Sequence, residues 1–544
     1  MRLPRPRLTL PRLPAAPAGL VRLRPRMPAR RSTRAAAAAG VAVLLAAGTV
    51  VAVSVVDGEP HGASAASIAT FSQTPGWMVD PSTGPLAGGS ALPSYAAPTA
   101  PPVAAPPPTI PPVSVVPPVT VPLPTPSRPV VPPASTPTPP TTPASSPTPT
   151  APAQSDVTPP HAPTSVPASL FGLTVNGYGS GAAVDAPYGA VRLWDTQVTW
   201  QDLEPERGTF DWARLDAQVA AANKARARVM LVLGQTPQWA ADKVAVTTPP
   251  SQLPTGSSPP KKLSDWTAYV KAVVTRYKGR IADYEVWNEP NAKNFWLGSQ
   301  GDLIPLAKSA YTTIKAVDPG ATVTTPSFVV RRPAQQGELT RYLAADGAKW
   351  ADVVNLHLYP DADQGPEAMA PLLDQVKTRL AAFGVEKPIW NTEVNYLLPT
   401  GGAAAPAPLS ADDAAAWVAR TYLITAHLGV GRAYWYAWDN HVLGVPLTES
   451  DGTTPNAAGK AYDRIHTWLQ GSGFRGCSVD NEGTWTCWVA TGRVVWNPGA
   501  GSKPVDYAAP WGTKAAVALS GASTPTRHGQ VVKIGTSPIL VKTR

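Results

Sequence analysis

Short apolar runs alternate with longer mixed stretches from Leu170 to Trp438. A run of roughly four to eight apolar residues between turn residues is typical of a buried strand, whereas apolar residues three or four positions apart are typical of a helix face. Eight runs occur: LFGLTV from Leu170, AVRLWD from Ala190, RVMLVLG from Arg228, ADYEVWNE from Ala282, ATVTTPS from Ala321, DVVNLHLY from Asp352, KPIWNTEV from Lys387 and RAYWYAW from Arg432. The pattern predicts eight strands.

Helix signals lie between these runs. In LSDWTAYVKAVVTRYKGR, Ser264 is the expected N-cap and Gly279 the expected stop, with an apolar stripe between them. Strands that alternate with helices indicate a parallel sheet covered on both faces. Eight such units in about 300 residues predict an α/β fold, a (β/α)8 TIM barrel over residues 168–470. An open doubly wound sheet is the alternative, but a Gly-rich phosphate loop is missing after the first run.

The helical pattern stops after about Gly471. The short segments TWTCWVA, RVVWN, AAVALSG, VVKIG and ILVKT follow, and they predict a small β-sandwich over residues 471–544. Cys477 and Cys487 flank a segment, SVDNEGTWT, that reads as a turn between two strands. In a protein outside the cell, such a close pair favours a structural disulfide across a hairpin.

Residues 57–167 are predicted to be a disordered linker. From Pro101 to Pro167 there are 26 prolines in 67 residues, mixed with Thr, Ser, Ala and Val. Such a stretch favours an extended polyproline II conformation and would reach about 200 Å when fully stretched. We expect an inert tether that holds the barrel away from a surface. A docking segment is the alternative.

The positive charge of the chain is confined to its first residues. Residues 1–34 hold ten arginines and no acidic residue, and this equals the whole formal excess of 46 basic over 36 acidic residues. Nucleic-acid binding would require basic residues spread over a folded face. The charge pattern therefore argues against a nucleic-acid partner and predicts a basic cytoplasmic tail.

An uncharged segment of 22 residues, 35–56, follows the tail. A membrane-spanning helix needs about 20 apolar residues, and the arginines before the segment would stay in the cytoplasm. We expect a single-pass anchor in the cell membrane, with the rest of the chain extracellular. The alternative is a cleaved signal segment, which would give a secreted protein. Both readings export the barrel.

Two glutamates end predicted strands of the barrel. Glu289 ends the fourth run, and Glu393 ends the seventh. Reactive side chains of such barrels project from the carboxyl ends of the strands. Retaining hydrolysis of a glycosidic bond needs two carboxyl groups about 5 to 5.5 Å apart, one protonated and one ionised. The pair is therefore a candidate for this chemistry, although any such barrel has glutamates near its rim.

The surrounding motifs resemble those of the clan A glycoside hydrolases, which include families 5 and 39. The resemblance rests on WNEPN around Glu289 and WNTEV around Glu393, and it extends to VRLWDTQVTWQDLEPERGTFDWARLD, LVLGQTPQWA, NLHLYP and YWYAWDN. It covers roughly residues 168–470. It implies a retaining (β/α)8 enzyme, and the accessory sandwich resembles that of family 39.

The resemblance implies a role for each matching position. Glu289 would be the acid/base and Glu393 the nucleophile, while Asn288 would bind the sugar 2-hydroxyl. The further residues implied are Arg192 and Tyr359 as supports of the nucleophile, His357 in the same wall, and Trp435 or Trp438 as an aromatic floor. Glu285, four residues before the acid, reads as a hydrogen-bonding residue of the barrel interior.

The sequence thus predicts a membrane-tethered glycosidase that cleaves O-glycosidic bonds of a β-linked cell-wall or extracellular polysaccharide by double displacement. We expect a monomer without cofactor, since no cluster of His or Cys residues has the spacing of a metal site. The alternative is a catalytically inactive barrel that binds wall glycan as a scaffold. Such a barrel would usually lack one carboxylate, and both are present here.

Overall fold

The computed structural model describes residues 42–46, 49–53, 158–181, 183–242, 256–292, 294–398, 406–439, 441 and 444–544. The predicted tail and most of the predicted linker lie outside these residues. Within the predicted anchor, Ala42–Ala46 (β1) and Thr49–Val53 (β2) pair as antiparallel strands. The segment TVVAV is rich in β-branched residues, which favour strands.

Among the described residues, no helix is both long and apolar enough to cross a membrane. Only residues 42–46 and 49–53 of the predicted anchor are among the described residues, and the anchor at residues 35–56 stays a prediction.

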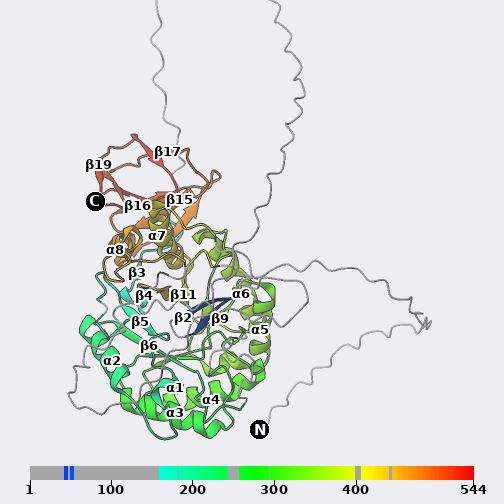
Figure 1. The fold of residues 1–544 in the computed structure, drawn as a ribbon. Helices are drawn as coiled ribbons and strands as arrows, with labels where there is room; N and C mark the ends of the chain where they lie inside the picture. The colour runs from blue at the N-terminus through cyan, green and yellow to red at the C-terminus, as the bar shows by residue number, and fades with distance from the viewer. Residues whose placement is uncertain are drawn as a thin grey trace, which may run out of the picture.

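The centre of the molecule is a curled parallel sheet (Figure 1). Its strands lie in the order β8-β7-β6-β5-β4-β12-β11-β10-β9. Their bounds are β4 Phe171–Thr174, β5 Ala190–Leu193, β6 Arg228–Leu233, β7 Asp283–Val286, β8 Thr322–Thr324, β9 Phe328–Val329, β10 Val354–His357, β11 Ile389–Val394 and β12 Ala433–Tyr436. Each of the eight predicted apolar runs contains one of these strands, and the ninth strand, β9, directly follows the fifth run.

The fifth strand position is split into β8 and β9. Pro326, which has no N–H to donate, lies between the two pieces. β8 pairs with β7 and β9 pairs with β10, while parallel bridges join Asn288 to Ser327 and Thr324 to Val353. These bridges carry the ladder across the break. The sheet therefore closes into a barrel with eight strand positions.

Helices surround the barrel in Figure 1. Their bounds are α1 Trp200–Leu203, α2 Ala213–Ala225, α3 Leu263–Tyr277, α4 Gln300–Val317, α5 Pro333–Ala344, α6 Met369–Ala382, α7 Ala411–His427 and α8 Ala457–Leu469, with 3-10 turns η1 Ala168–Leu170, η2 Gly347–Trp350 and η3 Pro366–Ala368. In the described part of the connection between β4 and β5 there is no helix, so the alternation of strand and helix begins at β5.

The predicted cap of α3 is wrong. The helix begins at Leu263 with Lys262 as its N-cap, so Ser264 lies inside the first turn. Its end is close to the prediction, because Gly279 follows shortly after the helix with a φ of 70°, a left-handed conformation that glycine adopts easily. The apolar stripe is buried as expected: Trp266, Val270 and the other stripe residues are at most 1 % exposed.

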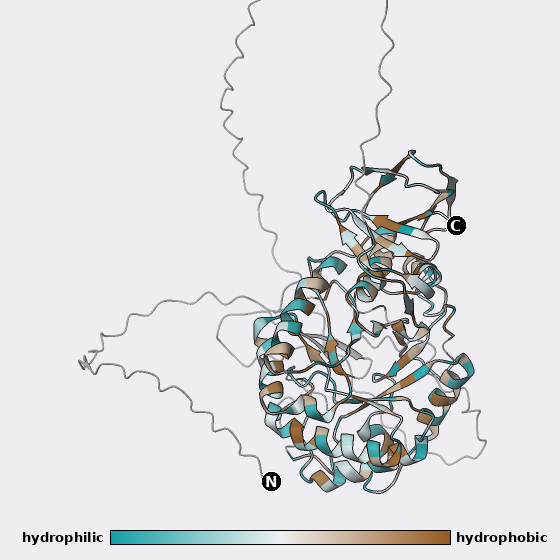
Figure 2. Ribbon diagram, turned by 180° about the vertical axis from the view of Figure 1, so that it is seen from behind, coloured by the Kyte–Doolittle hydropathy of each residue, from teal (hydrophilic) through white to brown (hydrophobic). Residues whose placement is uncertain are grey.

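Figure 2 shows hydrophobic residues along the central strands, whereas the outer helices carry both hydrophobic and hydrophilic stretches. This is the distribution expected for parallel strands that are covered by amphipathic helices.

The residues after α8 form antiparallel sheets. One sheet has the order β14-β15-β16-β21-β18-β19, and a second pairs β17 with β20. Val495 and Val541 of the first share a core with Tyr507, Val532 and Ile534 of the second, so the two sheets form the predicted small sandwich. The strand bounds are β13 Gly471–Phe474, β14 Cys477–Val479, β15 Trp485–Val489, β16 Gly492–Trp496, β17 Val505–Ala508, β18 Ala515–Ala518, β19 Ser523–Pro525, β20 Val531–Ile534 and β21 Ile539–Lys542.

The predicted disulfide is present. Cys477 of β14 and Cys487 of β15 face each other in register and are joined by an S–S bond. Both half-cystines are buried in the same hydrophobic cluster as the barrel.

The sandwich packs directly on the barrel near α7 and α8 (Figure 1). Trp496 Nε1 donates to Oε1 of Glu367 at 2.9 Å, and Arg420 Nη1 donates to the carbonyl of Thr536 at 3.3 Å. In addition β3, Thr164–Val166, precedes the barrel in sequence and pairs with β13. The last residues of the predicted linker, from residue 158, therefore include a strand that pairs with the sandwich end of the molecule.

Candidate active site

Glu289 and Glu393 lie at the same end of the barrel. Glu289 follows β7 and Glu393 lies near the end of β11, and all strands of a parallel barrel end at one mouth. The backbone after β7 is unusual, because Trp287 (φ 74°) and Glu289 (φ 42°) are in the left-handed region. Neighbouring residues of a regular strand point to opposite faces, but here the side chains of Asn288 and Glu289 both reach the mouth.

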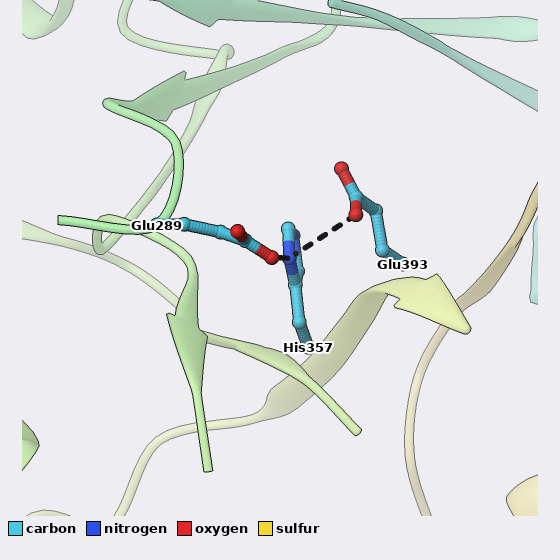
Figure 3. A group of neighbouring side chains, drawn as sticks. All are labelled: Glu289, His357 and Glu393. Atoms are coloured by element: carbon cyan, nitrogen blue, oxygen red, sulfur yellow. Dashed lines mark hydrogen bonds and ion pairs between the residues drawn. The ribbon is translucent and has the colours of Figure 1, made fainter. Parts of the chain in front are cut away.

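His357, the last residue of β10, lies between the two carboxyl groups (Figure 3). Its Nδ1 is 2.7 Å from Oε1 of Glu289 and 3.4 Å from Oε2 of Glu393. One oxygen of each carboxyl group and one ring nitrogen all lie within 4.8 Å of one another. The two carboxyl groups are therefore close enough to act on opposite sides of one bond.

Arg192 of β5 connects the buried polar groups beneath them. Its Nε and Nη2 donate to the two carboxylate oxygens of Glu285 at 2.9 and 2.7 Å, and Nη1 donates to Oε1 of Glu393 at 2.6 Å. Nη2 also donates to Oδ1 of Asn288 at 2.7 Å. Arg192 and Glu285 are fully buried, which agrees with the interior role predicted for Glu285.

The contacts of Glu393 stabilise its ionised form more strongly than the contacts of Glu289 stabilise its own. Burial raises the pKa of both carboxyl groups, and that of Glu289 reaches about 7. Glu393, however, accepts hydrogen bonds from the Arg192 guanidinium and, at 2.7 Å, from the hydroxyl of Tyr359. Burial also raises the pKa of Tyr359, so this hydroxyl keeps its proton. Bonds of this kind stabilise the charged form, and Glu393 is therefore the first of the two to ionise.

A chain of hydrogen bonds sets the tautomer of His357. Thr324 Oγ1 donates to the carbonyl of Thr325 at 2.9 Å, and Asn355 Nδ2 donates to that hydroxyl oxygen at 3.4 Å. Thr392 Oγ1 then donates its only hydroxyl proton to Asn355 Oδ1 at 2.7 Å. Nε2 of His357 lies 3.2 Å from Thr392 Oγ1, and it can only donate to this oxygen.

A neutral His357 with its proton on Nε2 has a lone pair on Nδ1. Burial lowers the pKa of His357 to about 4, so the ring is neutral at ordinary pH. The 2.7 Å contact between Nδ1 and Glu289 then requires a proton on Glu289. The hydrogen-bond chain and the raised pKa of Glu289 therefore agree that this carboxyl group is protonated in the resting site.

The two predicted floor residues are not exposed at the mouth. Trp435 and Trp438 are both fully buried, and Nε1 of Trp435 donates to the carbonyl of Val445 at 3.1 Å. Neither indole has an accessible face in this conformation, so the structure gives the predicted floor no support. The other predicted residues, Asn288, Arg192, His357 and Tyr359, meet around the two glutamates.

Sequence analysis missed several residues of the site. Thr392 and Asn355 stand within the motifs WNTEV and NLHLYP, but a polar residue inside a strand gives no signal of the bond that it makes. Tyr436, at the end of β12, donates its hydroxyl proton to Asp195, which follows β5. Burial raises the pKa of Asp195, and Glu289 acts in the same direction, so this pair belongs to the same polar cluster.

Glu289, His357 and Glu393 also have donor atoms close enough to surround a cation. The Arg192 guanidinium is already bound to Glu393, and its positive charge opposes a metal ion there. The neutral ring and the protonated carboxyl group account for the cluster without a metal.

Comparison with known proteins supports this interpretation of the barrel. Residues 200–443 match the family described as "Glycosyl hydrolases family 39". A curated relative named "Beta-xylosidase", from Caldicellulosiruptor saccharolyticus, is 30% identical over 157 residues, which cover 25% of this chain and 31% of that protein. The chain thus spans about a third of the length of this relative.

A solved structure has the same fold. It is a family 39 glycoside hydrolase from the gut symbiont Bacteroides cellulosilyticus WH2, with a TM-score of 0.52 and 19% identity, and the match covers 69% of this chain and 81% of that one. At this identity the likeness concerns the fold alone. The family match covers β6 to β12, and in this part of the chain the barrel is similar to the family 39 glycoside hydrolases.

Proposed function

We propose that this protein is a retaining glycoside hydrolase that cleaves a β-linked glycan. One observation carries the proposal: oxygens of Glu289 and Glu393 lie within 4.8 Å of each other across His357. Retaining enzymes hold their two carboxyl groups about 5 to 5.5 Å apart, whereas inverting enzymes need about 6.5 to 9.5 Å to admit a water molecule. The observed separation supports retention.

In the first step, an oxygen of ionised Glu393 attacks the anomeric carbon, and the bond from that carbon to the glycosidic oxygen breaks. Glu289 gives its proton to the departing oxygen, so the leaving sugar departs as an alcohol. In the second step, Glu289 takes a proton from water while the water oxygen attacks the anomeric carbon and releases Glu393. Two inversions give net retention, and both carboxyl groups return to their starting states.

The neighbouring residues fit these steps. The hydrogen bonds of Arg192 and Tyr359 orient the two oxygens of Glu393 and favour its ionised form. The side chain of Asn288 lies beside them, bound to Arg192, where it can donate to the 2-hydroxyl of the sugar. Nδ1 of His357 accepts a hydrogen bond from the protonated Glu289 until the glycosidic oxygen takes its place as acceptor.

We infer that the substrate is a cell-wall or extracellular polysaccharide and that the barrel is exported. The apolar segment 35–56 and the Pro-rich stretch after it support this inference, as a retained anchor or as a cleaved signal. Fractionation of producing cells distinguishes the two, since an anchored chain stays with the membrane after a high-salt wash and a cleaved one appears in the medium.

Product stereochemistry tests the proposal. The purified protein is incubated with a panel of aryl β-glycosides, starting with the β-xyloside, and with β-linked polysaccharides. We expect the first anomer seen by proton NMR to be β, before mutarotation mixes the anomers. Initial release of the α anomer would contradict double displacement. Binding without turnover across the panel would favour instead a glycan-binding scaffold.

The tautomer of His357 leads to a prediction about pH. Activity needs protonated Glu289, so kcat/KM falls as the pH rises through the pKa of this group, about 7. Thr392→Val removes the acceptor of the Nε2 proton. His357 can then carry its proton on Nδ1 and donate to ionised Glu289, which lowers the pKa of Glu289. We expect the fall in kcat/KM to begin roughly one pH unit lower. A shift of this size corresponds to the free energy of about one hydrogen bond to a charged group.

The measurement is the pH profile of kcat/KM with an aryl glycoside, between about pH 4 and 9. Thr421→Val is the matched control, because it also removes a buried threonine hydroxyl but lies on α7, bonded to Tyr396. A Thr392→Val profile that declines at the same pH as the native profile would refute the assigned tautomer.

A further inference from the structure

The break in the fifth strand position brings a serine next to the acid. Ser327 directly follows Pro326 in this break and lies against the residues that follow β7. The N–H of Ser327 donates to the carbonyl of Trp287 at 3.2 Å, and the N–H of Glu289 donates to the Ser327 hydroxyl oxygen at 3.1 Å. Ser327 is fully buried, so both bonds are formed away from water.

These two bonds hold a stretch of backbone that is not a regular strand. Trp287 has a φ of 74° and Glu289 a φ of 42°, a region that residues other than glycine rarely adopt. Such a conformation persists where the surrounding structure holds it in place. Ser327 bonds the stretch on either side of Asn288, at Trp287 and at Glu289, and therefore bridges the unusual turn.

The hydroxyl group of Ser327 serves the Glu289 backbone more than it serves Asn288. Its oxygen accepts the bond from the N–H of Glu289 at 3.1 Å, and its own proton is directed at Oδ1 of Asn288 over 3.5 Å. The same Oδ1 accepts a much shorter bond, of 2.7 Å, from Arg192. Arg192 therefore fixes the Asn288 amide, whereas a buried N–H of Glu289 without the serine would lose this acceptor.

The place of the Glu289 carboxyl group depends on contacts at both ends of the residue. Its Oε1 lies 2.7 Å from Nδ1 of His357 (Figure 3), and its backbone is bonded to Ser327. A general acid has to lie within hydrogen-bond reach of the atom that it protonates. A displacement of about 1 Å can reduce a rate by about two orders of magnitude. The serine therefore controls a distance to which proton transfer is sensitive.

We propose that Ser327 is a positioning residue for proton transfer: its hydroxyl group holds the backbone of Glu289 so that the carboxyl group reaches the departing glycosidic oxygen. The inference rests on the proposed function. It also assigns a role to the split of the fifth strand, because Pro326 interrupts that strand directly before the serine that meets Glu289.

A comparison of two leaving groups in Ser327→Ala tests the inference. Both substrates carry the same non-reducing sugar, xylose first or whichever sugar the glycoside panel identifies. One is a dinitrophenyl β-glycoside, whose leaving group needs little protonation, and the other is a β-linked disaccharide, whose leaving group needs a proton. We expect kcat/KM to fall about 10- to 100-fold for the disaccharide and less than about threefold for the dinitrophenyl glycoside. The ratio is taken within one preparation, so a partly unfolded variant does not distort it.

The pH profile separates a displaced acid from a lost one. Glu289 is still present in Ser327→Ala, so kcat/KM for the disaccharide should still fall as the pH rises through about 7, and disappearance of this fall would overturn the inference. Thr421→Val is the matched control, because it also removes a buried hydroxyl and should leave the ratio unchanged.

Two further outcomes distinguish the inference from the proposed function. An equal loss on both substrates, or no loss on either, would mean that Ser327 does not position the acid, and would overturn the inference while the proposed function stands. A wild type that hydrolyses no glycoside would remove the proposed function and this inference together.

Discussion

Glu393→Gln is expected to reduce kcat/KM for aryl β-glycosides by about 10³-fold or more. The amide has nearly the shape of the carboxylate, but its oxygen is a weak nucleophile and cannot form the glycosyl-enzyme bond. The substitution also removes one of the two carboxylates that neutralise Arg192. Steady-state rates measure the loss, and Glu338→Gln on α5 is the control, because this glutamate pairs with Arg341 at the surface.

A second variant separates chemistry from folding. Glu393→Gly leaves space at the anomeric carbon, and azide added to it should restore turnover with an aryl glycoside and give the α-glycosyl azide. Such rescue requires a folded site. Near-wild-type activity of the Gln variant would exclude Glu393 as the nucleophile. The same conclusion would follow if both variants lost activity and azide did not restore it, although their melting temperatures were unchanged.

Glu289→Ala is expected to have an effect that depends on the leaving group. General acid catalysis contributes about 10²- to 10⁴-fold, and a dinitrophenol needs little of it because it departs as a stable anion. The first step should therefore slow greatly for an alkyl or sugar leaving group and little for the dinitrophenyl glycoside. In the native enzyme kcat/KM falls as the pH rises through about 7, where Glu289 loses its proton, and this fall should vanish in the variant.

The measurement is kcat/KM across a series of leaving groups and across pH. Azide should accelerate the second step of Glu289→Ala and give the β-glycosyl azide, because the covalent intermediate on Glu393 remains. An equal loss for all leaving groups would assign the acid to another residue.

The barrel could be predicted because each strand is an apolar run with turn residues around it. The split of the fifth strand could not, because Pro326 lies within a run, ATVTTPS, whose pattern is otherwise that of one strand. The α3 cap was misplaced for a similar reason: Ser264 has the residue type of a cap, but Lys262 occupies that position. Local propensity identifies an element better than it fixes its ends.

The two glutamates could be located in the sequence because their motifs are specific. Their protonation could not, because it depends on burial and on contacts between separate strands, such as those of His357 with Glu289 and Thr392. The aromatic floor was predicted from position alone, and Trp435 and Trp438 are instead packed in the core. A tryptophan near the end of a strand can face either the solvent or the layer of helices.

The pairing of β3 with β13 has a practical consequence for anyone who shortens this chain. A truncation after Leu469 would strip β3 of its partner, uncover the cluster that contains Cys477 and Cys487, and leave Glu367 without its bond to Trp496. The sandwich is therefore not a detachable module. Recombinant versions should begin before Thr164 and keep the last residues, since the two parts are expected to melt as a single cooperative unit.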